Sequence, residues 1–180
     1  MRSLDDVIKA YDVRGVVPDQ FDANLAHDIG AAFVRVIGAA ARDGGSGAVV
    51  IGHDMRPSGP DLVAAFADGV TEQGCDVVRI GLCSTDGMYF ASGSTGLPGA
   101  MFTASHNPAQ YNGIKLCRAG ATPVGQESGL REIRDLVQRW SADGIPAYDG
   151  APGTVTHRDL LADYAAFLND LVPLGAGRHL

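Results

Sequence analysis

The stretch AVVIGHDMRPSGPDLVAAFADGVTEQGCDVVRI, residues 48–80, decides the fold class. It opens with the short apolar run 48–52, which is typical of a strand buried on both faces. A helix is predicted next, because apolar residues recur at helical spacing after Ser58, a residue type that often caps helices. A glycine ends that helix, and residues 75–80 form a second apolar strand. The residues at helical spacing are Leu62, Phe66 and Val70.

The same alternation of short strands and amphipathic helices extends over the rest of the chain. Residues 22–41 place apolar side chains on one helical face, and Asp22 is suited to cap the start of this helix. The segment 143–154 is rich in Gly, Pro, Asp and Ala, which predicts a surface connection. The pattern favours an α/β fold, a layered sheet covered by helices on both faces. The other predicted elements are a short helix within 81–93, strands at 99–103 and 115–117, and helices at 127–140 and 158–172.

The composition indicates a globular domain and excludes several classes of partner. Hydrophobic residues make up 46% and charged residues 19% of the 180 residues, which fits neither a disordered tail nor a membrane protein. The formal net charge is −7 and no basic block occurs. We therefore expect neither nucleic acid nor a membrane as the main partner.

The cysteines and the first residues suggest a reducing compartment. Cys75, Cys83 and Cys117 are odd in number and lack C-x-x-C spacing, so we expect buried thiols rather than disulfides or a zinc site. Residues 1–9 are charged where a signal peptide would be apolar. Both observations favour a cytoplasmic protein.

Two predicted loops follow strands and contain reactive residue types. In a layered α/β domain, ligands gather at the carboxyl ends of strands. The stretch TASHNPAQYNGIK contains Ser105 and His106 on a loop rich in Asn, Pro and Gly, with Lys115 a little further on. The loop GHDMRPS contains Asp54 and Arg56, which we expect to brace their loop rather than touch a substrate. Together the two loops can bind and transfer an anion.

A serine beside a histidine suggests a serine hydrolase, but local geometry argues against it. Adjacent residues of an extended segment point in opposite directions, so His106 is poorly placed to deprotonate Ser105. The G-x-S-x-G elbow of hydrolases is missing, and neither Gly-rich nucleotide-binding pattern occurs in the chain. Phosphoryl transfer fits better, because a phosphorylated serine needs cations and backbone N–H donors around it. Asn107 and Asn112 can shape such a loop, and Lys115 can supply charge or transfer a proton.

Three motifs resemble one known family. KAYDVRG at residues 9–15, VVIGHDMRPSG at 49–59 and TASHNPAQYNGIK at 103–115 resemble, in order and spacing, the α-D-phosphohexomutases of the bacterial phosphomannomutase/phosphoglucomutase type. GLCSTDGMYFASG at 81–93 is similar to the family's segment before the active-site strand. The resemblance implies an enzyme whose phosphoserine donates its phosphoryl group to a hexose monophosphate and recovers one from the resulting bisphosphate. The net reaction interconverts hexose 1-phosphates and 6-phosphates of mannose or glucose.

The resemblance also implies roles for individual residues. Ser105 is similar to the family's phosphoserine, His106 to the neighbour that contacts the reacting group, and Lys115 to the general acid/base. The cofactors implied are Mg²⁺, bound through the phosphate on Ser105, and a hexose 1,6-bisphosphate as activator. The residues implied to bind phosphate or to shape its loop are Tyr11, Arg14, Asn107 and Asn112.

Much of the family's pattern lies outside these 180 residues. Members have four domains; residues 1–155 resemble the first, and residues 156–180 resemble its closing helix and the start of a linker to the second. The D-x-D-x-D loop that supplies the metal-binding carboxylates does not occur in the sequence. We therefore expect domains 2–4 as partners, hexose phosphates as ligands, and no turnover by residues 1–180 alone. The alternative is a stand-alone domain that retains the fold as a binding or interaction module.

Overall fold

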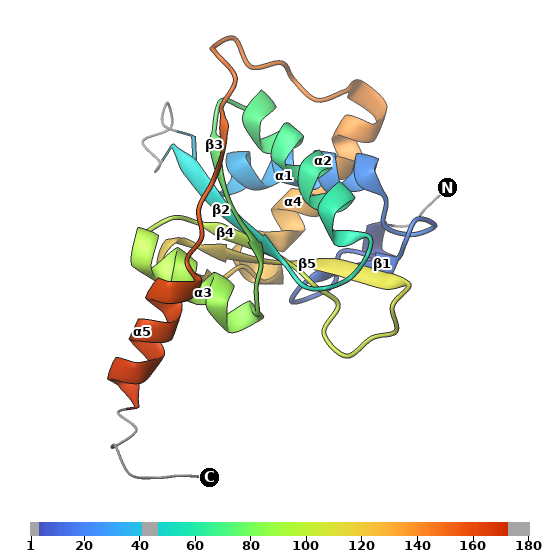
Figure 1. Ribbon diagram of the computed structural model, residues 1–180. Coiled ribbons are helices and arrows are strands. Elements are labelled where there is room, and N and C mark those ends of the chain that lie inside the picture. The colour runs from blue at the N-terminus through green and yellow to red at the C-terminus, as the bar shows by residue number, and fades with distance from the viewer. Residues whose placement is uncertain (1–3, 41–46, 173–180) are drawn as a thin grey trace, which may run out of the picture.

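The computed structural model describes residues 4–40 and 47–172, and its centre is a mixed sheet of seven strands (Figure 1). The strand order is β1-β5-β4-β2-β3-β7, with β6 paired to β5. β2 is parallel to β3 and β4, whereas β5 is antiparallel to β1 and β4 on either side of it. The strands are β1 (Val13–Val16), β2 (Ala48–His53), β3 (Asp76–Leu82), β4 (Gly99–Phe102), β5 (Tyr111–Arg118), β6 (Thr122–Pro123) and β7 (Val155–His157).

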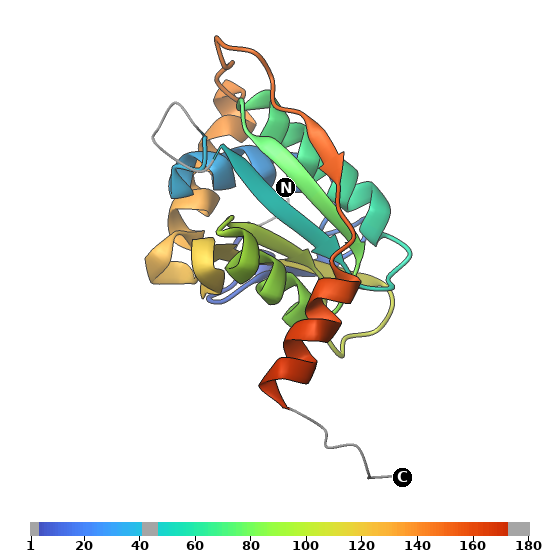
Figure 2. The ribbon, with the colours of Figure 1, turned by 60° about the vertical axis from the view of Figure 1, so that its left-hand side comes forward.

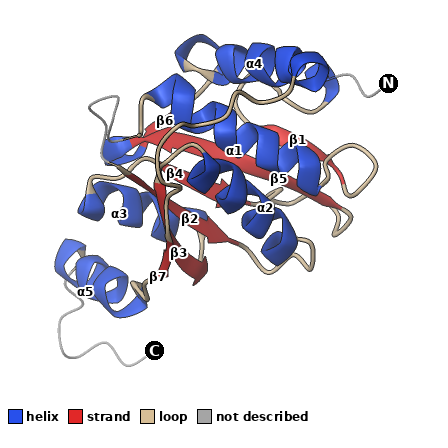
Figure 3. Cartoon of the chain, turned by 90° about the horizontal axis from the view of Figure 1, so that it is seen from above, coloured by secondary structure: helices blue, strands red, loops and turns tan. Residues whose placement is uncertain are grey.

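Helices cover both faces of this sheet, which confirms the predicted fold class (Figure 3). α1, α2 and α4 lie on one face, and α3 and α5 lie on the other. No helix among the described residues has the length and apolarity needed to cross a membrane. The helices are α1 (Ala23–Ile37), α2 (Gly59–Glu72), α3 (Thr85–Thr95), α4 (Leu130–Asp143) and α5 (Leu161–Leu171), with short 3-10 turns at Leu4–Asp6, Ala119–Ala121 and Gln126–Ser128.

The central strands are buried on both sides, as their unbroken apolar sequences predict. Val49 and Ile51 of β2 face the larger core under α1, α2 and α4, whereas Val50 faces a smaller cluster under α3. In the larger core, the Phe66 ring lies 6.0 Å from the Phe33 ring and 5.4 Å from the Phe102 ring. Aromatic contacts at these separations add to the stabilisation from burial and fasten α1 and α2 to β4.

The predicted helix starts are confirmed in one case and corrected in another. The carboxylate of Asp22 accepts a hydrogen bond of 2.9 Å from the Leu25 amide, so Asp22 caps α1 as expected. Ser58 precedes α2 but makes no capping hydrogen bond. Its hydroxyl instead accepts a hydrogen bond of 3.0 Å from the side-chain amide of Asn112, on a strand far along the chain. A tertiary contact has taken the place of the local one.

Three strands are additional to those predicted, and the bounds of the predicted strands shift by one or more residues. β1, β6 and β7 fall in segments that sequence analysis left without regular structure, and β5 spans Tyr111–Arg118 rather than 115–117. β4 ends at Phe102, one residue before the predicted end. The boundary expected between residues 155 and 156 falls inside β7, which pairs with β3.

The last helix, α5, is much less buried than its apolar sequence suggests. None of its residues is buried, and Figures 1 and 2 show it extending away from the sheet beyond α3. Its contacts include the Phe90 ring of α3, which lies 5.4 Å from the Tyr164 ring and 5.1 Å from the Phe167 ring. Leu161 and Leu171 are 72% and 64% exposed, so the apolar face of α5 is largely open to solvent.

Candidate active site

Ser105 lies on the loop that joins β4 to β5 and adopts a left-handed backbone conformation. Its φ is +54°, a region that costs a non-glycine residue about 1–3 kcal/mol. Its amide donates a hydrogen bond of 3.0 Å to the hydroxyl of Thr103, and its own side chain is exposed. The loop therefore presents the Ser105 hydroxyl to solvent from a backbone that other contacts must hold in place.

His106 lies beside this hydroxyl without forming a strong hydrogen bond to it. The distance from His106 Nδ1 to Ser105 Oγ is 3.5 Å, which is at the outer limit for such a bond. Both side chains are exposed. This weak contact agrees with the expectation that His106 is poorly placed to deprotonate Ser105. It leaves the imidazole close enough to contact a group attached to Ser105 Oγ.

A chain of polar contacts links Lys115 to the Ser105 loop. Lys115 Nζ lies 3.3 Å from Asp12 Oδ2, and Arg14 Nη2 donates a hydrogen bond of 2.6 Å to the same oxygen. Arg14 Nη1 in turn donates to Asn107 Oδ1 at 3.3 Å. The antiparallel pairing of β1 with β5 thus brings two cations together around one carboxylate, at the edge of the loop. Asp12, which joins them, was missing from the predicted set.

The guanidinium of Arg14 still has donors for another group. Its Nε is buried and has no hydrogen-bond partner among the described residues. Buried polar atoms in proteins are nearly always paired, so this donor calls for an acceptor. Phosphate oxygens are strong acceptors for guanidinium groups. The Arg14 side chain as a whole is 27% exposed, so an anion beside Asn107 can reach its guanidinium.

The two remaining predicted residues have different positions. Asn112 is fully buried, and its Oδ1 accepts a hydrogen bond of 2.8 Å from the Gly113 amide. With its contact to Ser58, Asn112 fixes the base of the loop where β5 begins, as the predicted loop-shaping role requires. Tyr11 is 84% exposed on the segment before β1. The structure therefore brings Asn112 into the loop's support and leaves Tyr11 at the surface.

Asp54 and Arg56 brace the structure, as predicted, but over a wider range than their own loop. Arg56 is 7% exposed, and its guanidinium donates hydrogen bonds to backbone carbonyls of the Ser105 loop as well as to Asp54. Its burial separates it from any substrate that approaches from solvent. The Thr103 hydroxyl accepts a hydrogen bond from the Ser105 amide and donates one to Asp54. Sequence analysis predicted no role for Thr103.

The residues near Ser105 do not form a metal site by themselves. The described part of the chain contains no group of three or more His, Cys, Asp or Glu side chains arranged to hold a metal ion. The carboxylates nearest the loop, Asp12 and Asp54, are already paired with arginine or lysine.

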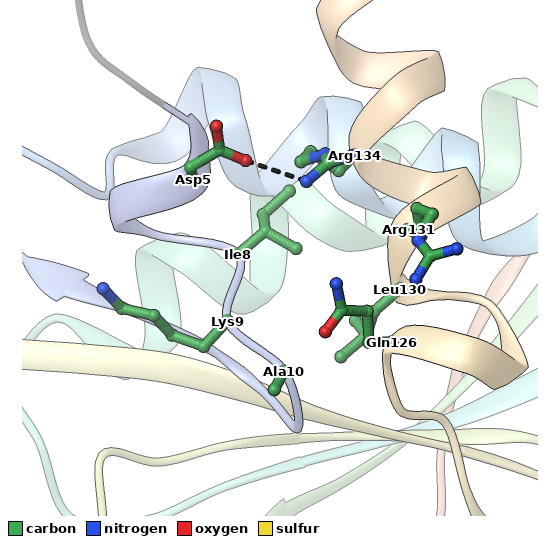
Figure 4. Close-up of a pocket in the computed structure, with 8 residues that line it drawn as sticks. All are labelled: Asp5, Ile8, Lys9, Ala10, Gln126, Leu130, Arg131 and Arg134. Atoms are coloured by element: carbon green, nitrogen blue, oxygen red, sulfur yellow. Dashed lines mark hydrogen bonds and ion pairs between the residues drawn. The ribbon is translucent and has the colours of Figure 1, made fainter.

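A separate pocket lies beside the Lys9–Ala10 segment (Figure 4). It has a volume of about 260 Å³ and is lined by side chains from the first 3-10 turn and the start of α4. Arg134 is paired there with Asp5 at 2.8 Å, and Arg131 is paired with Glu127. These pairs neutralise most of the pocket's charge. None of the predicted catalytic residues lines it.

Fold and site together define the class of protein: an α/β domain with a serine-centred, cation-lined candidate site at the end of its central strands. The family described as phosphoglucomutase/phosphomannomutase, alpha/beta/alpha domain I, matches residues 5–143. The chain belongs to this family.

Curated relatives and solved structures agree with this assignment. The chain is 42% identical over 165 residues to "Phosphohexose mutases" of Xanthomonas campestris pv. campestris strain B100, covering 91% of this chain and 34% of that protein. It is 36% identical over 168 residues to a phosphomannomutase of Escherichia coli, covering 92% and 35%. A putative phosphomannomutase from Thermus thermophilus superposes with a TM-score of 0.74 at 30% identity, covering 91% of this chain and 35% of that one. The chain thus spans about a third of the length of these relatives.

Proposed function

We propose that this chain is the phosphoserine domain of a phosphohexomutase that interconverts hexose 1-phosphates and 6-phosphates. The observation that supports it most directly is the placement of Ser105. Its exposed hydroxyl stands on a strained, braced loop, next to the Asp12-linked pair of Lys115 and Arg14. The relatives named above are mutases of this kind, which supports the same reaction class.

The proposed reaction consists of two phosphoryl transfers. In the first, a free hydroxyl of the hexose monophosphate attacks the phosphorus on Ser105, the bond from phosphorus to Oγ breaks, and a hexose bisphosphate forms. In the second, Oγ attacks the other phosphate of the bisphosphate, which restores phosphoserine and releases the isomeric monophosphate. The attacking hydroxyl loses a proton and the departing oxygen gains one. Lys115 is the candidate for moving these protons, and His106 for contacting the transferred group.

The neighbouring residues have supporting roles in this proposal. Arg14 would bind a phosphate oxygen with its partly exposed guanidinium, and Asn107 would hold Arg14 against the loop. Asn112 would fix the loop's base, and Tyr11 would reach the substrate from its exposed position. We propose Mg²⁺ as cofactor and a hexose 1,6-bisphosphate as activator. When bound, the metal would neutralise charge on the transferred phosphoryl group.

We further propose that the chain works with additional domains and in the cytoplasm. It spans about a third of its relatives, and its described cysteines are free, as a reducing compartment requires. Residues 1–180 alone should not sustain turnover, because most carboxylate ligands and sugar contacts implied by the family are missing from this sequence.

The test is phosphate transfer to one serine. The purified chain is incubated with glucose 1,6-bisphosphate, with and without Mg²⁺, and its intact mass and peptides across residues 103–115 are measured. We expect one added phosphate on Ser105, absent from Ser105→Ala. Ser128→Ala, a change at an exposed serine outside the loop, is the matched control and should accept phosphate normally. Phosphate that is absent in every condition, or that persists in Ser105→Ala, would refute the proposal and favour a binding module.

A further inference from the structure

The buried guanidinium of Arg56 has all of its donors directed at the protein. Nη1 donates to the carbonyls of Pro108 and Tyr111, each at 2.8 Å. Nη2 donates to the carbonyls of Ser105 and Asn107, each also at 2.8 Å. A guanidinium has five N–H donors, and the fifth, on Nε, donates to Asp54 at 3.2 Å. Arg56 therefore has no donor left for a substrate phosphate.

The four carbonyls belong to one loop, the loop that presents the Ser105 hydroxyl. They span Ser105 to Tyr111, which is the full path from the candidate nucleophile to the first residue of β5. A planar fork that contacts four carbonyls fixes the curvature of the backbone between them. Lysine cannot reproduce this arrangement, because its ammonium is a single point with three donors.

Asp54 secures the opposite side of Ser105. Its Oδ2 accepts a hydrogen bond of 2.7 Å from the Thr103 hydroxyl, and that hydroxyl accepts the Ser105 amide at 3.0 Å. The amide of Asp54 also donates to the Phe102 carbonyl at 2.9 Å, which ties Asp54 to the end of β4. The amide side of Ser105 is thus linked to Asp54 through Thr103, and its carbonyl is linked directly to Arg56.

We propose that Asp54 and Arg56 are positioning residues that hold Ser105 in its left-handed conformation and so aim its Oγ for phosphoryl transfer. The inference rests on the proposed function of Ser105 but concerns residues that touch neither substrate nor metal. The 7% exposure of Arg56 excludes it from direct phosphate binding, and the salt bridge to Asp54 removes the need for an outside anion. The pair acts on the reaction through the backbone of the loop.

The first experiment measures the loop itself, without any phosphoryl donor. Amide hydrogen exchange and backbone chemical shifts of Ser105 are recorded by NMR in the 180-residue chain, in Arg56→Lys and in Thr103→Val. We expect exchange of the Ser105 amide to accelerate by about tenfold or more in both variants, the equivalent of about 1.4 kcal/mol. The shifts that mark a positive φ should be lost in Arg56→Lys. Amides of β2 and α1 should keep their protection.

Arg118→Lys is the matched control, because Arg118 also donates to a backbone carbonyl, that of Ser128 at 2.9 Å, outside this loop. It should leave the Ser105 amide unchanged. If Arg56→Lys does not fold, Thr103→Val still tests the link on the amide side, since it removes no charge. An unchanged Ser105 amide in the folded variants would overturn the proposal. So would a loss of protection spread evenly over the core, because that result indicates general stabilisation rather than positioning.

The second experiment measures the phosphorylation of Ser105 as a function of glucose 1,6-bisphosphate concentration. We expect the maximal rate to fall by about 10- to 100-fold in Arg56→Lys, with the half-saturating concentration unchanged. A raised half-saturating concentration with an unchanged maximal rate would assign Arg56 to substrate binding and overturn the inference. If the unaltered chain accepts no phosphate, the proposed function fails, whereas the exchange measurements still decide whether the brace exists.

Discussion

Gly113 gives the sharpest test of how β1 and β5 assemble the candidate site. In the antiparallel register, Gly113 of β5 pairs with Arg14 of β1, one of the two cations that contact Asp12. A Cβ atom at position 113 would lie 2.1 Å from the carbonyl oxygen of Val13 and 3.1 Å from that of Thr103. Both atoms belong to the main chain and cannot rotate away. Gly113→Ala must therefore push β1 from β5.

The expected cost follows from this overlap. Overpacking a well-filled site costs about 1–3 kcal/mol, and a clash with backbone on two sides places this change at the upper end, about 3 kcal/mol. For a chain of this size, each kcal/mol lowers the Tm by about 2–4 °C, so we expect a fall of about 6–12 °C. The contact between Arg14 and Asn107 should weaken as well, since β1 positions Arg14.

Thermal unfolding followed by circular dichroism measures the loss. Gly93→Ala is the control, because position 93 lies in α3 and a Cβ there would meet no other atom within 4 Å. That change should stabilise the chain by about 0.5–1 kcal/mol, since alanine favours helix over glycine. If Gly113→Ala melts within about 2 °C of the unaltered chain, a Cβ atom fits between the two strands, and the reasoning is wrong.

Three further predictions concern pH, thiol reactivity and charge. Burial lowers the pKa of His27, but hydrogen bonds to two carboxylates outweigh this effect and raise the pKa above 6.5. The stabilisation lost in His27→Gln should therefore be largest at acid pH and vanish as the pH rises through the raised pKa. Measured as a difference in Tm, it should correspond to less than about 1 kcal/mol. Burial raises the pKa of Cys75 to about 12 and that of Cys83 to about 11, so at neutral pH both should react slowly with Ellman's reagent in the native chain and fully in denaturant. Asp12→Asn should cost about 1–3 kcal/mol of unfolding free energy, because it leaves Lys115 beside another cation; melting curves should show partial recovery in high salt, and equal losses at all salt concentrations would contradict this origin.

Sequence patterns predicted the elements with strong periodicity and missed the short ones. α1, α2 and α4 contain three or four turns of apolar spacing, and each appears close to its predicted range. β7 has three residues and β1 has four, one of which is a glycine, so neither shows an alternation long enough to detect. Both strands depend on neighbours, β3 and β5, that are distant in sequence.

The exposure of α5 could not be predicted, because an apolar stripe looks the same whether or not another surface covers it. Phe167 and Leu168 occupy positions typical of a buried face, yet they are 45% and 44% exposed. The prediction that Ser58 caps α2 was wrong for a similar reason. Capping preferences take only nearby backbone amides into account, whereas the Ser58 hydroxyl accepts its hydrogen bond from Asn112 on a different strand.

For the candidate site, motifs located the residues and the structure supplied their connections. Ser105, Lys115 and Arg14 were named from their sequence context, and the last two do meet around a carboxylate. Asp12 was overlooked, although it stands in the same motif as Arg14, because a carboxylate between two cations has no spacing signature when the strands are far apart in sequence. The reach of Arg56 across the Ser105 loop was equally hidden, since its acceptors are main-chain carbonyls that every residue type possesses.

The main-chain contacts of Arg56 leave the side chains of the Ser105 loop free to vary. Because Arg56 contacts only carbonyl oxygens within the loop, it specifies the route of the peptide chain and is indifferent to the side chains along it. Ala109 and Gln110 are exposed and form none of these contacts, so they can be replaced without disturbing the geometry at Ser105. The backbone of the loop has a fixed shape, and its exposed side chains are interchangeable. An engineer could vary those groups to alter what approaches the serine while leaving the serine where it is.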